Sequence, residues 1–354
     1  MGNGKFYVVV LCSFLSFSIL PAEPIDAAKT TKTILNTVVK VRSEVPAKAR
    51  TARSLGTERE GNGVVIGSNR LILTIGDLVL KANRVEVTGP SGKGLSARFL
   101  GYDHNTGFGL IGAEKPLNVE PIKFGNSSEV HERDWVLVVS HGGPDSVQGA
   151  FVVSRREFTG YWEYLLENAI FTAPPHAGFG GAALIGSDGR LLGVGSLIVP
   201  DAAVAPEPIP GNMFVPINLL KPIFADLIIK GRSSKPPRPW LGIYSQEIEG
   251  RILVVRITPG GPGDKAGAKP GDMIVGVGGT EVKGLADFYR KVWSRGKAGV
   301  KVPLNMLQGM HVHEFMVRSS DRYKHLKLRP NKRNFYGQGF TMRNRMLGCN
   351  RLAK

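Results

Sequence analysis

The groups that could do nucleophilic or acid–base chemistry lie in glycine-containing turns beside apolar runs. Acyl transfer needs a hydroxyl nucleophile, an imidazole that takes its proton, and a carboxylate that orients the imidazole. Histidines occur in or beside two of these turns, at His104 and His176, and a third turn carries Asp77. The three turns are LILTIGDLV (71–79), GYDHNTGFGLI (101–111) and GFGGAALIGSDGRLLGVGS (178–196).

The cysteine and histidine content argues against a metal centre. The chain has two cysteines, Cys12 and Cys349, and no Cys/His cluster with the spacing of a zinc site. We therefore predict no metal and no cofactor. Loss of Cys12 with a cleaved signal segment would leave one cysteine, which excludes an intrachain disulfide.

The first residues have the order of an export signal. Lys5 precedes an apolar run over residues 6–20, Pro21 ends the run, and small residues follow as far as Ala28. The run is short for a membrane span, which needs about 20 apolar residues. We predict a signal peptide at residues 1–28 and a periplasmic or extracellular location. An uncleaved segment that anchors the chain in the membrane is the alternative.

The remaining chain divides into two units joined by a linker. Residues 29–60 are polar and basic, and we interpret them as a leader segment. In residues 61–231, short β-rich runs recur between Gly, Asn and Asp turns, which predicts an all-β barrel or sandwich. The end of this unit has apolar residues at helical spacing and stops at Gly231. A basic, Pro-rich linker follows at 232–239, and a second, smaller unit at 240–320.

The C-terminal segment, residues 321–354, is strongly basic. Residues 322–354 carry ten Lys and Arg and no acidic residue, and they contribute to the formal net charge of +17. We expect this tail to be disordered unless a partner neutralises it. Interleaved aromatic residues make an anionic membrane surface the alternative partner, and we expect no nucleic acid because the chain is exported.

Several stretches resemble the HtrA (Deg) family of serine proteases in order and spacing. They are GNGVVIG (61–67), the three turns above, NMFVPINLLKPIFADLIIKG (212–231) and RPWLGI (238–243). The resemblance implies a mainly β chain: a trypsin-like double β-barrel followed by a PDZ domain, which is an α+β unit. Relatives of this architecture commonly form trimers, so a homotrimer or an assembly with active relatives is implied as well.

The resemblance also shows where catalytic side chains are expected. The family's histidine falls on Asp77 and its aspartate on Gly107. The serine falls on Gly180 when the alignment is anchored on Asp188, or on Gly181 when it is anchored on Thr172. A carboxylate, with a pKa of about 3.9 in model peptides, is a weak base at neutral pH. These three degenerate positions therefore predict that no catalytic residue is present.

Other residues were weighed as replacements for this triad. Ser140, Ser154 and Ser187 lie outside the tight turn where oxyanion donors converge, and we interpret His104 and His176 as surface loop residues. A relocated triad would need three coincident changes. An active endopeptidase with a relocated site is kept as the alternative function.

The PDZ resemblance implies a peptide site of its own. Such domains bind a peptide C-terminus as an added strand, with loop amides holding the terminal carboxylate. The resemblance assigns this role to the loop and strand Trp240, Leu241, Gly242 and Ile243, and to Leu285 and Phe288 on the following helix. The expected function is therefore a non-catalytic envelope protein that binds peptide C-termini or unfolded chains and scaffolds or regulates active proteases.

Overall fold

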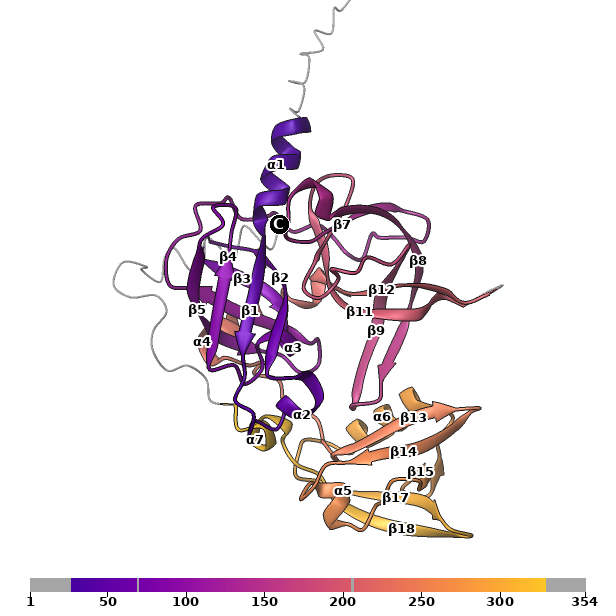
Figure 1. Cartoon of the computed structure of the whole chain (residues 1–354). Helices are drawn as coiled ribbons and strands as arrows, with labels where there is room; N and C mark the ends of the chain where they lie inside the picture. The colour runs from indigo at the N-terminus through magenta and orange to yellow at the C-terminus, as the bar shows by residue number, and fades with distance from the viewer. Residues whose placement is uncertain (1–26, 69, 205–206, 329–354) are drawn as a thin grey trace, which may run out of the picture.

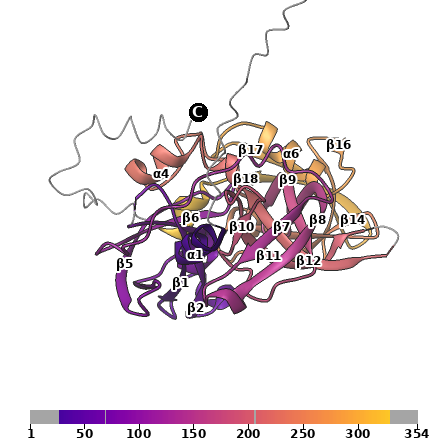
Figure 2. The same cartoon turned by 90° about the horizontal axis from the view of Figure 1, so that it is seen from above.

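The structure is a computed structural model that describes residues 27–68, 70–204 and 207–328. Two closed β-barrels lie side by side, and a separate sheet with its own helices lies below them (Figures 1 and 2). The prediction of a mainly β chain with a double barrel and a second unit is confirmed. The predicted signal peptide, up to residue 26, and the tail from 329 onward lie outside the described residues. None of the described helices is long and apolar enough to cross a membrane.

The first barrel has the strand order β1-β2-β3-β6-β5-β4. Its inward face is aliphatic, because alternate residues of each strand are buried against one another. Residues 38–60 were expected in a leader segment, but they form β1 and the start of β2, which close this barrel. The strands are β1 (Val38–Glu44), β2 (Glu58–Val65), β3 (Leu71–Ile75), β4 (Arg84–Thr88), β5 (Gly94–Tyr102) and β6 (Phe108–Ala113).

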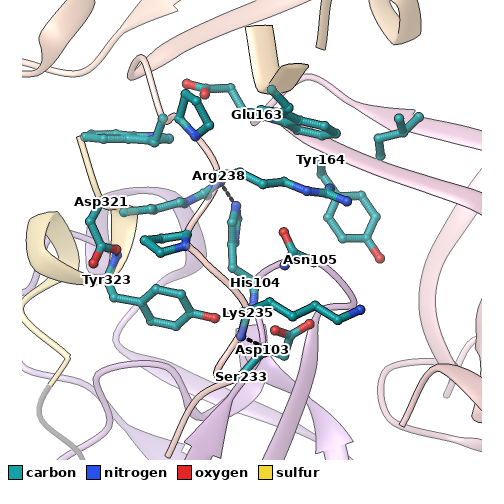
Figure 3. Close-up of a pocket in the computed structure, with 16 residues that line it drawn as sticks. Asp103, His104, Asn105, Glu163, Tyr164, Ser233, Lys235, Arg238, Asp321 and Tyr323 are labelled. Carbon is teal, nitrogen blue, oxygen red and sulfur yellow. Dashed lines mark hydrogen bonds between the residues drawn. The ribbon is translucent and has the colours of Figure 1, made fainter. Parts of the chain in front are cut away.

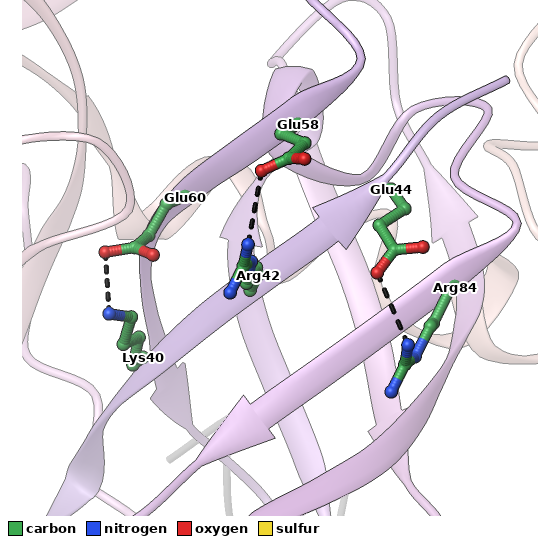
Figure 4. Close-up of polar contacts among 6 residues, drawn as sticks. All are labelled: Lys40, Arg42, Glu44, Glu58, Glu60 and Arg84. Atoms are coloured by element: carbon green, nitrogen blue, oxygen red, sulfur yellow. Dashed lines mark hydrogen bonds and ion pairs between the residues drawn. The ribbon is translucent and has the colours of Figure 1, made fainter.

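The outward face of β1 explains why this strand was not recognised. Its charged residues alternate with buried ones and pair across the barrel surface with neighbouring strands (Figure 4). Such exposed pairs contribute little stability, but they satisfy the charges of a strand whose other face is apolar. The pairs are Lys40–Glu60 at 2.7 Å, Arg42–Glu58 at 3.2 Å and Arg84–Glu44 at 3.4 Å.

The second barrel has the order β10-β11-β12-β9-β8-β7. One hydrophobic cluster runs through both barrels and includes Leu73 and Phe108 from the first and Phe171 and Met213 from the second. Strands β8 and β9 form a long hairpin that extends from the barrel toward the second unit (Figure 1). The strands are β7 (Trp135–Val139), β8 (Val147–Gly160), β9 (Tyr164–Ala173), β10 (Ala183–Ile185), β11 (Leu191–Ala203) and β12 (Ile209–Pro216).

The predicted helix before the linker is present but short. A 3-10 turn, η2 (Ile217–Leu219), precedes α4 (Phe224–Lys230), and Gly231 ends the helix in the left-handed conformation at φ 72°. Leu220, Ile223 and Leu227 are buried against the barrels, as their helical spacing predicts. The linker therefore leaves the barrels from a fixed point.

The second unit is a sheet of order β13-β14-β15-β17-β18, with β16 paired to β15. Its core packs α6 against the sheet. The elements are β13 (Ile243–Ile248), β14 (Arg251–Ile257), α5 (Pro262–Lys265), β15 (Met273–Val277), β16 (Thr280–Glu281), α6 (Leu285–Ser294), β17 (Lys301–Gln308) and β18 (His311–Arg318). The remaining helices are α1 (Ala27–Thr37), α2 (Ala52–Leu55), α3 (Gly76–Val79), η1 (Pro144–Ser146) and α7 (Arg322–Leu326).

The start of the basic tail is ordered, contrary to prediction. Asp321 caps α7 by accepting a hydrogen bond from the amide of Tyr323 at 2.9 Å. The ring of His325 lies 4.3 Å from that of Trp240, and Arg322 donates to the carbonyl of Trp162 at 2.7 Å. Contacts within the chain therefore hold residues 321–328, so their charge does not lead to disorder.

Candidate functional sites

The positions expected for the catalytic base and acid are brought together. Asp77 lies in α3 directly after β3, and Gly107 directly precedes β6. Strands β3 and β6 pair with Ile75 opposite Phe108, and the amide of Gly76 donates to the carbonyl of Gly107 at 2.7 Å. The barrel therefore keeps the backbone arrangement in which a base and its orienting acid would be neighbours.

Asp77 is a carboxylate near two arginines. The residue is exposed, but neighbouring protein atoms partly desolvate its carboxylate. This desolvation raises the pKa of Asp77, and the nearby guanidinium groups of Arg322 and Arg59 oppose the rise. Arg59 also donates to the carbonyl of Asp77 at 2.7 Å. The group is held in place, but it does not have the two nitrogens with which an imidazole relays a proton.

Gly107 supplies a turn and no acid. Its φ is +80°, a left-handed conformation that favours glycine. The turn is stabilised by Asp103, which accepts hydrogen bonds from the amide and the hydroxyl of Thr106, each at 2.9 Å. Tyr164 donates to the carbonyl of Thr106 at 2.9 Å. The nearest carboxylate in the turn thus has a structural role.

The nucleophile loop resolves the one-residue ambiguity of the alignment. A Cβ added to Gly181, whose φ is +77°, would lie 1.9 Å from the carbonyl oxygen of Asn62. A Cβ added to Gly180 would meet no atom within 4 Å. Only Gly180 therefore has room for a side chain, and a serine of this loop would stand there.

A serine and a histidine do meet beside this loop. The hydroxyl of Ser140 lies 2.9 Å from Nε2 of His176, and a Cβ on Gly178 would lie 2.9 Å from the same hydroxyl. The backbone of His176 is fixed by Asn212, and burial lowers the pKa of the imidazole, which favours its neutral form. His176 lies in a loop and is half-buried, and this hydrogen bond ties it to the loop after β7. The two residues are 36 positions apart, so local sequence reasoning did not pair them.

His104 is a half-buried residue of the β5–β6 turn. Its Nδ1 lies 3.2 Å from the hydroxyl of Tyr102, and Arg322 donates to its Nε2. Burial and the Arg322 charge hold the pKa of His104 well below its usual range. Figure 3 shows His104 in a pocket between the first barrel, the linker and α7, with Asp103 and Tyr323 nearby. A neutral imidazole bonded on both nitrogens has a packing role here.

The loop expected to hold a peptide carboxylate already holds one. The carboxylate of Glu163, at the tip of the β8–β9 hairpin, accepts hydrogen bonds from three consecutive amides of this loop. The nitrogen–oxygen distances are 2.9 Å from Leu241, 2.6 Å from Gly242 and 3.1 Å from Ile243. Gly242 has a φ of +71°, which turns the backbone so that consecutive amides point to one acceptor. Sequence reasoning missed Glu163.

The other predicted peptide-binding residues do not all lie in one place. Leu241, Ile243, Leu285 and Phe288 belong to one buried cluster around α6, and Leu165 of the hairpin is part of that cluster. Trp240 does not take part, because its ring packs on His325 of α7 and its backbone pairs with Ser320. The structure thus brings the loop and helix residues together and packs the ring of Trp240 against α7.

Comparison with known proteins identifies both units. Residues 61–194 match the trypsin-like peptidase domain family, and residues 239–318 match the PDZ domain family. A probable periplasmic serine protease do/HhoA-like of Haemophilus influenzae is 25% identical over 278 residues, covering 73% of this chain and 57% of that protein. A probable periplasmic serine endoprotease DegP-like of Rickettsia conorii is 29% identical over 240 residues, covering 61% of this chain and 44% of that protein.

Solved structures agree on the fold. The serine endoprotease of Yersinia pestis superposes with a TM-score of 0.51 at 22% identity, covering 84% of this chain and 98% of that structure. The HtrA-type protease AlgW with decapeptide gives 0.52 at 17% identity, covering 83% and 98%. The chain spans about half the length of the curated relatives it matches. With a trypsin-like double barrel followed by a PDZ domain, it has the domain organisation of the HtrA-type serine proteases.

Proposed function

We propose that the chain is a non-catalytic HtrA-like protein that binds the C-termini of peptides, or unfolded polypeptide, through its PDZ domain. The observation that carries the proposal is Gly180, which has room for a side chain at the nucleophile position and has none. Asp77 and Gly107 add a carboxylate in place of the base and bare backbone in place of the acid. Removal of a triad forfeits several orders of magnitude in rate, because its members act as a unit.

The peptide site supports the binding half of the proposal. Three amides of residues 241–243 converge on one carboxylate, which is the chemistry a peptide C-terminus offers. The buried cluster beside α6 would take an apolar last side chain. HtrA-type structures with bound peptides belong to the same fold.

Two measurements on the purified full-length chain test this function. We expect unfolded casein to remain intact in its presence. We also expect a fluorescent peptide that ends in two valines with a free carboxylate to bind more tightly than its C-terminal amide. Cleavage of casein by the chain, or equal affinity for the two peptides, would contradict the proposal.

The Ser140–His176 hydrogen bond favours one second candidate, an endopeptidase with a relocated nucleophile and base. Against it, Ser140 is only 7% exposed, and its hydroxyl is also 3.2 Å from the carbonyl of Ser146. Substitution of Ser140 by Ala decides between the two, with exposed Ser187→Ala as the matched control. Casein cleavage lost in the first variant and kept in the second would establish the relocated site.

We further propose that the chain acts in the bacterial envelope. Its curated relatives are described as periplasmic, and the order of its first 28 residues is that of a signal peptide. We propose three interactions in the envelope. The chain forms a homotrimer or an assembly with active HtrA-type proteases, and its basic tail contacts anionic membrane lipid. Fractionation of cells followed by crosslinking of the native complex tests these proposals, which fail if the chain is found only in the cytoplasm.

A further inference from the structure

We propose that the PDZ peptide groove is occupied in cis, with the β8–β9 hairpin as an internal ligand and Glu163 as the substitute for a peptide C-terminal carboxylate. This inference deepens the proposed peptide-binding function and rests on it. It predicts that an external peptide must displace the hairpin before it can bind.

The carboxylate contact is the first argument. Glu163 is 6% exposed and comes from a different domain, yet its oxygens bond three successive loop amides. A buried carboxylate needs such donors, because an unpaired one would carry a large desolvation cost. The loop amides need an acceptor for the same reason when they are shielded from water. The Glu163 carboxylate therefore accepts the hydrogen bonds that the loop amides would otherwise donate to the C-terminal carboxylate of a bound peptide.

The backbone of the hairpin supplies the strand contact. The amide of Ser245 in β13 donates to the carbonyl of Tyr161 at 3.0 Å. This is a main-chain bond between the groove strand and the inserted segment, of the kind that added strands form. The ring of Tyr161 also lies against that of Tyr244, with centroids 6.1 Å apart. The tip of the hairpin thus contacts β13, and Figure 1 shows the hairpin ending next to α6 and β13.

The side-chain pocket is filled from the same hairpin. Leu165 is 6% exposed and packs in the PDZ core together with Leu241, Ile243 and Phe288. Leu165 therefore provides the apolar anchor that the last residue of a bound peptide would provide.

The helix side of the groove is held to the hairpin as well. The hydroxyl of Tyr289 in α6 donates to the carbonyl of Gly160 at 2.9 Å, and the amide of Glu163 donates to that hydroxyl at 3.3 Å. Arg290 forms ion pairs with Glu157 and, at 3.8 Å, with Glu167. Both walls of the groove therefore contact the hairpin, which leaves no path for a second chain without displacement.

The test uses the full-length chain with Glu163→Ala and, as the matched control on the same hairpin, Asn168→Ala, whose exposed side chain bonds Arg155 of the hairpin itself. Glu163→Gln serves as a second variant that keeps the shape of the side chain. Two readouts are taken: hydrogen exchange at the amides of residues 241–243 without peptide, and binding of the fluorescent free-carboxylate peptide.

We expect Glu163→Ala to exchange faster at these amides and to bind the peptide at least roughly tenfold more tightly. In the wild type, the apparent affinity for the peptide is reduced in proportion to the fraction of molecules whose hairpin is undocked. The control should match the wild type in both readouts. Unchanged exchange in both Glu163 variants would overturn the cis occupation. Faster exchange in a chain that binds no peptide would leave the cis contact standing and refute the proposed peptide-binding function.

Discussion

Asn62 and Gly180 join the two barrels through two hydrogen bonds to one carbonyl oxygen. The side-chain Nδ2 of Asn62 donates to the carbonyl of Gly180 at 3.0 Å, and its backbone amide donates to the same oxygen at 2.8 Å. Nδ2 also reaches the carbonyl of Gly178, while Oδ1 accepts from the amide of His141. The loop therefore keeps a defined backbone although it carries no hydroxyl.

This relationship leads to the first prediction. Asn62→Ala should lower the free energy of unfolding by about 1–3 kcal/mol, because it leaves the half-buried carbonyl of Gly178 and the amide of His141 without their Asn62 partner, while the backbone amide of residue 62 still bonds Gly180. Asn168→Ala, which removes an exposed side chain bonded to Arg155 at 3.2 Å, is the control and should change it by less than about 0.5 kcal/mol. Urea denaturation measures both. Equal stability of the two variants would show that Asn62 does not support the loop.

The second prediction separates the two glycines of the nucleophile loop. Gly180→Ser should be tolerated within about 1 kcal/mol, since a Cβ there meets open space. Gly181→Ser should cost more than about 3 kcal/mol, because its Cβ would collide with the carbonyl of Asn62 at a positive φ. Thermal unfolding of both variants checks this. The reverse order of stabilities would mean that the serine position was assigned to the wrong residue.

The third prediction concerns pH. Burial raises the pKa of Glu163 to about 7, and the amides of residues 241–243 together with Arg322 oppose the rise. The titratable and charged groups around it are Arg322 of α7, His104 and Asp103 of the β5–β6 turn, Arg238 of the linker and Tyr289 of α6.

The sign follows from this raised pKa. The pKa of the Glu163 carboxyl is higher when the hairpin is docked than when the hairpin is free. Docking is therefore most favourable at a pH below the pKa of the free carboxyl, and this advantage is lost as the pH rises toward about 7. The hairpin should therefore dock best in acid, and external peptide should bind at least roughly tenfold more tightly at pH 8 than at pH 5. Fluorescence anisotropy across this range measures it. The Glu163→Gln variant should show no such slope, and a slope equal to that of the wild type would contradict the assignment to Glu163.

The sequence predicted the architecture better than the sites. Short apolar runs between Gly-rich turns predict an all-β barrel or sandwich, because strand period and turn chemistry are local properties, and the resemblance to the HtrA family implies the two barrels. Strand β1 was missed because Lys40, Arg42 and Glu44 occupy its outward face and give residues 38–44 the composition of a polar leader. The order of residues 321–328 was missed for a related reason, since their charges are paired and packed by residues far away in the chain.

The functional contacts depend on long-range placement. Glu163 bonds residues 78 to 80 positions later, and Ser140 meets a histidine 36 positions later. Nothing in the local spacing of these residues indicates that they meet, because the docking of the PDZ domain and the closure of the second barrel create both contacts. The positions predicted to be degenerate, Asp77, Gly107 and Gly180, follow from the resemblance, because each lies inside a turn that resembles the family's pattern.

The most direct test of the central claim is the reaction of the purified chain with a fluorophosphonate probe, read by intact mass, with an active HtrA-type protease labelled in parallel. We predict that this chain keeps its unmodified mass while the active protease gains one adduct. An adduct on this chain, mapped by peptide mass spectrometry to Ser140, would show that the Ser140–His176 pair holds an activated serine and that the protein is a protease after all.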